Sequence, residues 1–127
     1  MKNVITLVRD FHDAFEQPYP KEPSLLTEKE SLLRYSLMKE ETEEYLDAVN
    51  NKDIVGIADA LGDQLYILAG TIIKHGLHNI IEDVFKEIHQ SNMSKLGANG
   101  KPIFREDGKI LKGPSYFKPN LNKIIHG

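Results

Sequence analysis

Residues 54–74 read IVGIADALGDQLYILAGTIIK and form the most apolar stretch of the chain. The apolar residues lie nearly all round the helix that this spacing predicts, a pattern typical of a central, largely buried helix. Asp59 and Asp63 lie one turn apart within it and share a face. A carboxylate removed from water needs a cation, a basic side chain or a water-filled cleft, so this pair is a first candidate for a functional site.

A second acidic cluster lies about twenty residues earlier, at residues 39–44, which read KEETEE. Glu40 and Glu44 are four residues apart and Glu41 and Glu44 three, so their side chains share a helix face. Like charges at this spacing destabilise a helix by a few tenths of a kcal/mol per pair, roughly. Either water solvates these acids or a divalent cation lies between them.

The rest of the chain is predicted to be mostly helical. The spacing of apolar residues predicts four helices, at residues 3–16, 27–49, 54–74 and 80–95. Capping signals support their ends: Thr27 with Glu30, Asp53, Gly76, and Asn79 with Glu82. Prolines exclude helix from residues 17–24. We therefore expect an all-α fold, a four- to five-helix bundle.

The C-terminal part has a different character. Glycines and prolines recur from Gly97 onward, and residues 102–111 could form a short hairpin or belong to an extended arm. We expect one domain over residues 1–127, with a helical bundle at 1–96 and a non-helical basic arm at 97–127.

Composition restricts the possible classes of protein. The 127 residues contain no cysteine, which excludes disulfides and thiolate chemistry, and no run reaches the ~18 apolar residues of a membrane span. We expect a cytoplasmic protein.

Charge is distributed unevenly along the chain. Residues 1–90 carry 17 acidic and nine basic side chains, whereas residues 91–127 carry two acidic and seven basic ones. The basic tail could fold back on the acidic body, pair with a second copy, or help to bind a metal and a polyanion together, but nucleic-acid binding is not indicated.

The acidic residues indicate a chemistry. Oxygen ligands from two neighbouring helices suit a hard cation such as Mg²⁺, or Mn²⁺. Magnesium is normally held by a few carboxylates together with water and substrate phosphates, and such a site stabilises the charge of phosphoryl or nucleotidyl transfer.

These motifs resemble a known family. Glu40–Glu41–x–x–Glu44, followed by Asp59–Ala–Leu–Gly–Asp63, is similar to the MazG-like all-α nucleoside triphosphate pyrophosphohydrolases. The similarity is greatest to the phosphoribosyl-ATP pyrophosphohydrolase-like branch, related to the dimeric dUTPases. It covers nearly the whole chain and includes the stretches NMSK at 92–95 and DGKILKGP at 107–114.

The resemblance implies hydrolysis of a nucleoside triphosphate such as dUTP between its α- and β-phosphates, assisted by Mg²⁺. It implies Glu40 and Glu41 as catalytic carboxylates and Glu41, Glu44 and Asp63 as metal ligands. Glu40 is expected to be a further ligand or the group that orients the attacking water, and Asp59 is a fourth candidate metal ligand. The wider family has a glutamate where this chain has Ala60, and a lysine where it has Ile57. Asp59 is an imperfect substitute for that glutamate, because it lies about 100° around the helix.

The resemblance also implies substrate contacts and a partner. Lys95, Lys109 and Lys112 are expected to contact phosphates, and Asn92 the sugar or base. Three aromatic residues, Phe11, Phe15 and Tyr19, could stack on a base, although Phe11 and Phe15 also have the spacing of core residues. We expect a homodimer or a higher homo-oligomer. The alternative function is a non-catalytic helical module that senses nucleotides or binds a partner, which the loss of the glutamate at Ala60 would favour.

Overall fold

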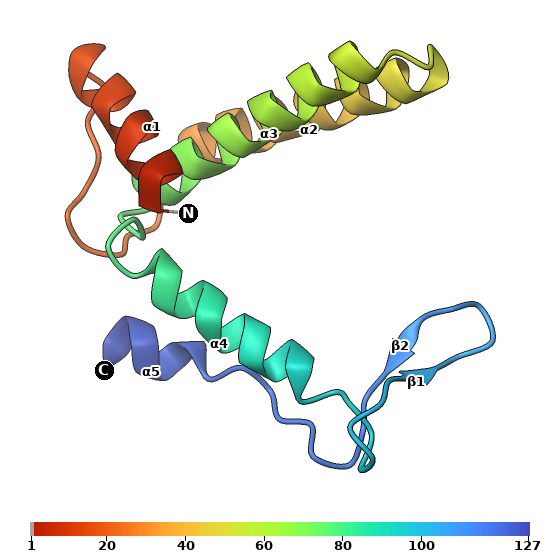
Figure 1. The fold of residues 1–127 in the computed structure, drawn as a ribbon. Helices are drawn as coiled ribbons and strands as arrows, with labels where there is room; N and C mark the ends of the chain where they lie inside the picture. The colour runs from red at the N-terminus through yellow and green to blue at the C-terminus, as the bar shows by residue number, and fades with distance from the viewer. Residues whose placement is uncertain (1) are drawn as a thin grey trace. The chain divides into compact units, whose positions relative to one another are not determined.

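The computed structural model describes residues 2–127, which form five α-helices and a two-stranded hairpin (Figure 1). The elements are α1 (Lys2–Ala14), α2 (Glu28–Asn50), α3 (Ile54–Lys74), α4 (Ile81–Met93), β1 (Ile103–Phe104), β2 (Ile110–Leu111) and α5 (Leu121–His126). The all-α prediction is therefore confirmed. The chain divides into two compact units, residues 1–79 and 80–127, which are described separately below.

The first unit is built on the pair formed by α2 and α3, which run side by side (Figure 1). Helix α1 packs on α3. Side chains also join the long helices: Gln64 donates a hydrogen bond to Thr42 Oγ1 over 3.1 Å. The buried apolar residues are few and mostly small: Ile5, Val8, Ala48, Ala60, Ala69 and Ile73. Small residues allow α2 and α3 to approach closely, since a Cβ at Gly56 of α3 would lie 3.2 Å from the Cβ of Ala48 of α2.

Three predicted helix ends are present in the structure. The Thr27 hydroxyl accepts a hydrogen bond from the Glu30 amide over 3.2 Å, and the Asp53 carboxylate accepts one from the Gly56 amide over 3.0 Å. Gly76 follows α3 with φ +67°, a conformation that glycine adopts without strain. Because each cap uses groups only a few residues apart, the local sequence is sufficient to place these ends.

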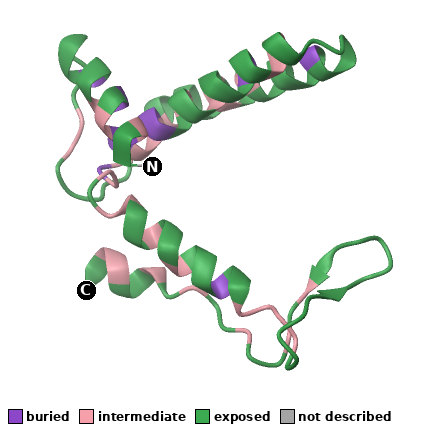
Figure 2. Ribbon diagram, in the orientation of Figure 1, coloured by how far each residue is buried: buried purple, intermediate pink, exposed green. Residues whose placement is uncertain are grey.

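The prediction that the helix at 54–74 is largely buried is wrong for the single chain. Exposed fractions reach 73% at Ile54, 75% at Val55 and 47% at Leu61, and most of α2 and α3 is exposed in Figure 2. Helix α2 covers one side of α3, and α1 covers part of the rest. Among residues 2–79, no element covers the remaining apolar surface.

The second unit contains α4, the hairpin and α5. Ser91 of α4 is buried, and its hydroxyl donates a hydrogen bond to the Phe117 carbonyl over 2.8 Å. Strands β1 and β2 are antiparallel, with Ile103 opposite Leu111, so the hairpin prediction is confirmed. Its turn includes Gly108 at φ +87°.

Two predictions for this unit are wrong. The expected cap of Asn79 with Glu82 is absent, because α4 begins after Ile80 and no side chain caps it. The tail was expected to be non-helical, yet α5 forms after Asn120, whose side chain accepts a hydrogen bond from the Lys123 amide over 3.3 Å. Helix α4 packs with α5. The assignment of one domain, with a boundary at residue 96, stays a prediction.

None of the helices within residues 2–127 combines the length and the apolar character that a bilayer crossing requires.

Candidate functional site

Three carboxylates converge between α2 and α3. One oxygen from each of Glu41, Glu44 and Asp63 lies within 4.8 Å of the others. Glu41 and Glu44 are one turn apart on α2, and Asp63 faces them from α3, because the Asn51–Lys52 turn sends α3 back along α2. The three acids that the resemblance implies as metal ligands are therefore neighbours in the fold.

The electrostatics of this cluster are unfavourable without a counter-charge. The Oε2 atom of Glu41 is buried and has no hydrogen-bond partner. Desolvation raises the pKa of Glu41 to about 7, and the neighbouring Glu44 carboxylate acts in the same direction, as do the charges of Asp63 and Glu40. Near neutral pH the cluster therefore favours a proton on Glu41 when no cation is bound.

The arrangement fits a divalent cation. The donors are carboxylate oxygens alone, which suits Mg²⁺ or Mn²⁺ better than the softer transition metals. The Oε2 atom of Glu41 has no hydrogen-bond donor, so its lone pairs are free to bind a cation. A cation would also offset the repulsion that raises the Glu41 pKa.

The other acidic candidates lie outside this cluster. Glu40 is exposed on α2, and its charge acts on Glu41. Asp59 is exposed on α3, one turn before Asp63. Ala60 is only 2% exposed, so the position where the wider family has a glutamate is filled by packed apolar surface in this chain. The roles of Glu40 and Asp59 stay predictions.

The predicted substrate-binding residues belong to the second unit. Asn92 is the penultimate residue of α4, and Lys95 follows the helix. The Gly113 amide donates a hydrogen bond to the Lys95 carbonyl over 2.8 Å, which brings Lys112 next to that segment. The Lys112 ammonium lies 4.7 Å from the centre of the Tyr116 ring, and Lys109 directly precedes β2 after the hairpin turn. Asn92, Lys109 and Lys112 are exposed.

The aromatic residues of the N-terminal segment contact one another. The rings of Phe11 and Phe15 stack with centroids 4.4 Å apart, and Tyr66 of α3 meets Phe11 edge-on at 5.7 Å. The Tyr19 hydroxyl donates a hydrogen bond to Asp13 over 2.7 Å. Phe11 is 40% exposed and Phe15 62% exposed, so both remain accessible to a ligand.

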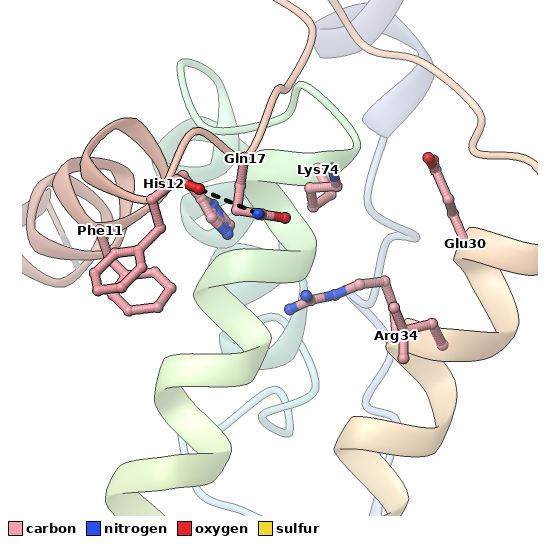
Figure 3. A pocket seen from close by; sticks show the side chains of 8 residues that line it. Phe11, His12, Gln17, Glu30, Arg34 and Lys74 are labelled. Atoms are coloured by element: carbon pink, nitrogen blue, oxygen red, sulfur yellow. Dashed lines mark hydrogen bonds between the residues drawn. The ribbon is translucent and has the colours of Figure 1, made fainter.

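A group of basic residues with no predicted role lines a cavity of about 390 Å³ beside these rings (Figure 3). The basic residues are His12 from α1, Arg34 from α2 and Lys74 from α3. Arg34 follows His12 by 22 residues, and Lys74 follows Arg34 by 40, so no short motif links the three. Arg34 precedes Glu41 by seven residues, a spacing that places both side chains on the same face of α2.

Comparisons with known proteins indicate the family to which the chain belongs. Residues 8–92 match the family model of phosphoribosyl-ATP pyrophosphohydrolase. A solved structure from Exiguobacterium sp. 255-15, whose suggested activity is NTP pyrophosphohydrolysis, is 26% identical and has a TM-score of 0.52. The match covers 96% of this chain and 91% of that chain. A search of curated proteins found no significant match. Because the family model spans all three clustered carboxylates, we conclude that the chain belongs to the phosphoribosyl-ATP pyrophosphohydrolase family, within the MazG-like all-α NTP pyrophosphohydrolase superfamily.

Proposed function

We propose that this protein hydrolyses a nucleoside triphosphate, such as dUTP, between its α- and β-phosphates with the assistance of Mg²⁺. The observation that carries the proposal is the cluster of Glu41, Glu44 and Asp63, with its unpartnered buried oxygen. Those three carboxylates would hold the cation. When bound, Mg²⁺ would polarise the phosphate oxygens and lower the charge that the attacking water meets.

The residues of the chain have distinct tasks in this proposal. A water molecule attacks the α-phosphorus, the bond from that phosphorus to the bridging oxygen breaks, and pyrophosphate leaves. Glu40, exposed beside Glu41, orients the water and accepts its proton. Lys95, Lys109 and Lys112 contact the phosphates and stabilise the negative charge of the leaving group.

Release of pyrophosphate tests this proposal. With Mg²⁺ or Mn²⁺ present, a panel of dNTPs and NTPs should yield the monophosphate and pyrophosphate in equal amounts, and turnover should stop in EDTA. Coupled pyrophosphatase and phosphate detection provides the measurement. Metal-dependent nucleotide binding without turnover of any nucleotide would contradict the proposal and favour a nucleotide-sensing module, in agreement with Ala60 at the glutamate position.

We also propose that the protein is a homodimer or a higher homo-oligomer. The exposed apolar residues of the first unit lie on both long helices, among them Leu46 of α2 and Leu61 and Leu65 of α3. A second copy would bring an identical apolar surface against them, as a two-fold interface requires.

Light scattering after size exclusion should give at least twice the 14.4 kDa of the chain. Leu61→Asp should lower that mass, because a carboxylate would have to be buried in the interface. Glu43→Asp, an exposed change on α2 that keeps the charge, is the control and should leave the mass unchanged. A wild-type mass of 14.4 kDa at micromolar concentration would contradict the proposal.

A further inference from the structure

The cavity between α1, α2 and α3 contains two cationic side chains without an acidic partner. Arg34 and Lys74 both line it (Figure 3). Within residues 2–127, Arg105 with Asp107 is the one ion pair whose atoms lie within 4.0 Å. A partly buried guanidinium stays charged, so the loss of its water must be offset by another negative group or dipole.

The guanidinium of Arg34 is held in a fixed position. Its Nε donates a hydrogen bond to Thr71 Oγ1 over 3.0 Å, and its Nη2 donates one to the Ile67 carbonyl over 3.0 Å. Burial lowers the pKa of Arg34. Both contacts are to neutral groups of α3, so they orient the guanidinium without neutralising it. The Nη1 atom has no recorded acceptor among residues 2–127.

His12 contributes a polar atom that lacks a partner. The residue is 5% exposed, and its Nδ1 is buried without a hydrogen bond. Gly70 allows the ring and the guanidinium to converge: a Cβ there would lie 2.7 Å from Arg34 Nη2 and 3.4 Å from the nearest ring carbon of His12. Burial, followed by the charges of Lys74 and Arg34, lowers the pKa of His12 and favours the neutral ring, whose N–H can donate a hydrogen bond.

The position of the cavity relates it to the carboxylate cluster. Arg34 precedes Glu41 by seven residues and Gly70 follows Asp63 by seven, which is nearly two helical turns on each helix. Each pair therefore lies on one face of its helix, separated by about 10 Å along the axis. Arg34 of the cavity and the carboxylate cluster therefore lie on the same side of α2, about two turns apart.

We propose that Arg34, Lys74 and His12 form a phosphate-binding subsite that does not require a metal. A phosphate group supplies the negative charge that both cations lack, and it accepts hydrogen bonds from a guanidinium, an ammonium and an imidazole N–H. Lys74, which also lines the cavity, donates to the Pro18 carbonyl over 2.7 Å, and this contact restrains its ammonium. The phosphate is either free inorganic phosphate or part of a bound nucleotide.

Glu30 is the one acidic residue that lines the cavity, and it provides a sensitive test. It is exposed and lies one turn before Arg34 on α2. Its carboxylate repels a phosphate that enters the cavity. Glu30→Gln should therefore tighten phosphate binding, by up to about fivefold for an exposed charge. The change removes no side-chain hydrogen bond of the cavity, because only the Glu30 backbone amide is bonded, to Thr27.

The test is calorimetric titration of the full chain with inorganic phosphate in EDTA, at constant ionic strength. We expect saturable binding of one phosphate per chain. Arg34→Gln should weaken it by at least about tenfold, the effect of losing a charged hydrogen bond. Arg105→Gln makes the same chemical change on the exposed hairpin and should leave binding unaltered.

Several results would overturn the subsite. They are the absence of saturable binding, equal binding of acetate, an equal loss in Arg105→Gln, and no tightening in Glu30→Gln. The last result is decisive even if Arg34→Gln fails to fold. Because the titration involves neither metal nor turnover, its failure would leave the proposed pyrophosphohydrolase function untouched, and a lack of turnover would leave the subsite untouched.

Once the titration has succeeded, nucleotide kinetics identify the source of the phosphate. If it belongs to the nucleotide, Arg34→Gln raises KM and inorganic phosphate competes with the nucleotide. If it is free phosphate, KM stays unchanged in Arg34→Gln and phosphate does not compete.

Discussion

Asp63→Asn is expected to reduce pyrophosphate release by on the order of 100- to 1,000-fold, the usual cost of losing one charged contact to a transition state. Asp63 supplies the single carboxylate from α3 to the three-residue cluster. An amide keeps the shape of the side chain but has no charge to hold a cation. The measurement is the steady-state rate with saturating nucleotide and Mg²⁺, together with a melting curve that shows the variant is folded.

Asp59→Asn is the matched control for that variant. It makes the same change one helical turn earlier on α3, at an exposed residue outside the cluster. Its rate should stay within a few-fold of wild type, whereas Glu44→Gln should behave like Asp63→Asn. A wild-type rate in either Asp63→Asn or Glu44→Gln would refute the assigned metal ligands. An equally large loss in Asp59→Asn would instead enlarge the site to include Asp59.

Glu41→Gln is expected to abolish metal binding and yet stabilise the metal-free protein. The folded state raises the pKa of Glu41 to about 7, chiefly by desolvation, so the fold favours the protonated form. The stability that comes from this proton is lost as the pH rises through 7. Glutamine is neutral at every pH, so the variant does not lose stability in this way. It should therefore melt at a higher temperature than wild type at pH 8. The difference should become smaller at pH 6.

The same pKa determines how metal affinity depends on pH. A cation must displace the proton of Glu41, and with a pKa of about 7 the affinity should fall about tenfold between pH 8 and pH 6. Calorimetric titration with Mn²⁺ at several pH values measures this. An affinity that does not change over this range would show that Glu41 is not a ligand, and so would Mn²⁺ affinity of wild-type strength in Glu41→Gln.

Much of the fold follows from local sequence. The helices α1, α2 and α3 match the predicted ranges closely, because apolar spacing defines each helix and Thr27, Asp53 and Gly76 define its ends. The hairpin was likewise indicated by its turn residues. The missed helix α5 also has local signals. Asn120 caps it by the same mechanism as Thr27, and apolar residues follow at helical spacing at Leu121, Ile124 and Ile125. The glycines and prolines in the preceding segment favoured a non-helical tail instead.

The acidic site was also recognisable from sequence, because its residues form short motifs. Glu41 and Glu44 lie one turn apart, and Asp63 lies on the helix that follows a short turn. Antiparallel pairing of the two helices along the faces that carry these acids brings them close together. What the sequence did not contain was the degree of burial: the apolar surface of α3 suggested a central helix, but the single chain provides too few neighbouring helices to cover it.

By itself, therefore, the sequence determined the helices, their caps and the three acids, since each depends on residues a few positions apart or on adjacent helices. Only the tertiary structure decided that Glu41 holds a buried, unpartnered oxygen, and that His12, Arg34 and Lys74 share one cavity. Burial and charge convergence depend on packing between segments distant in the chain, as the bond from Arg34 to Thr71 illustrates. Desolvation follows from that packing, and it governs both the proton on Glu41 and the unpaired charge of Arg34.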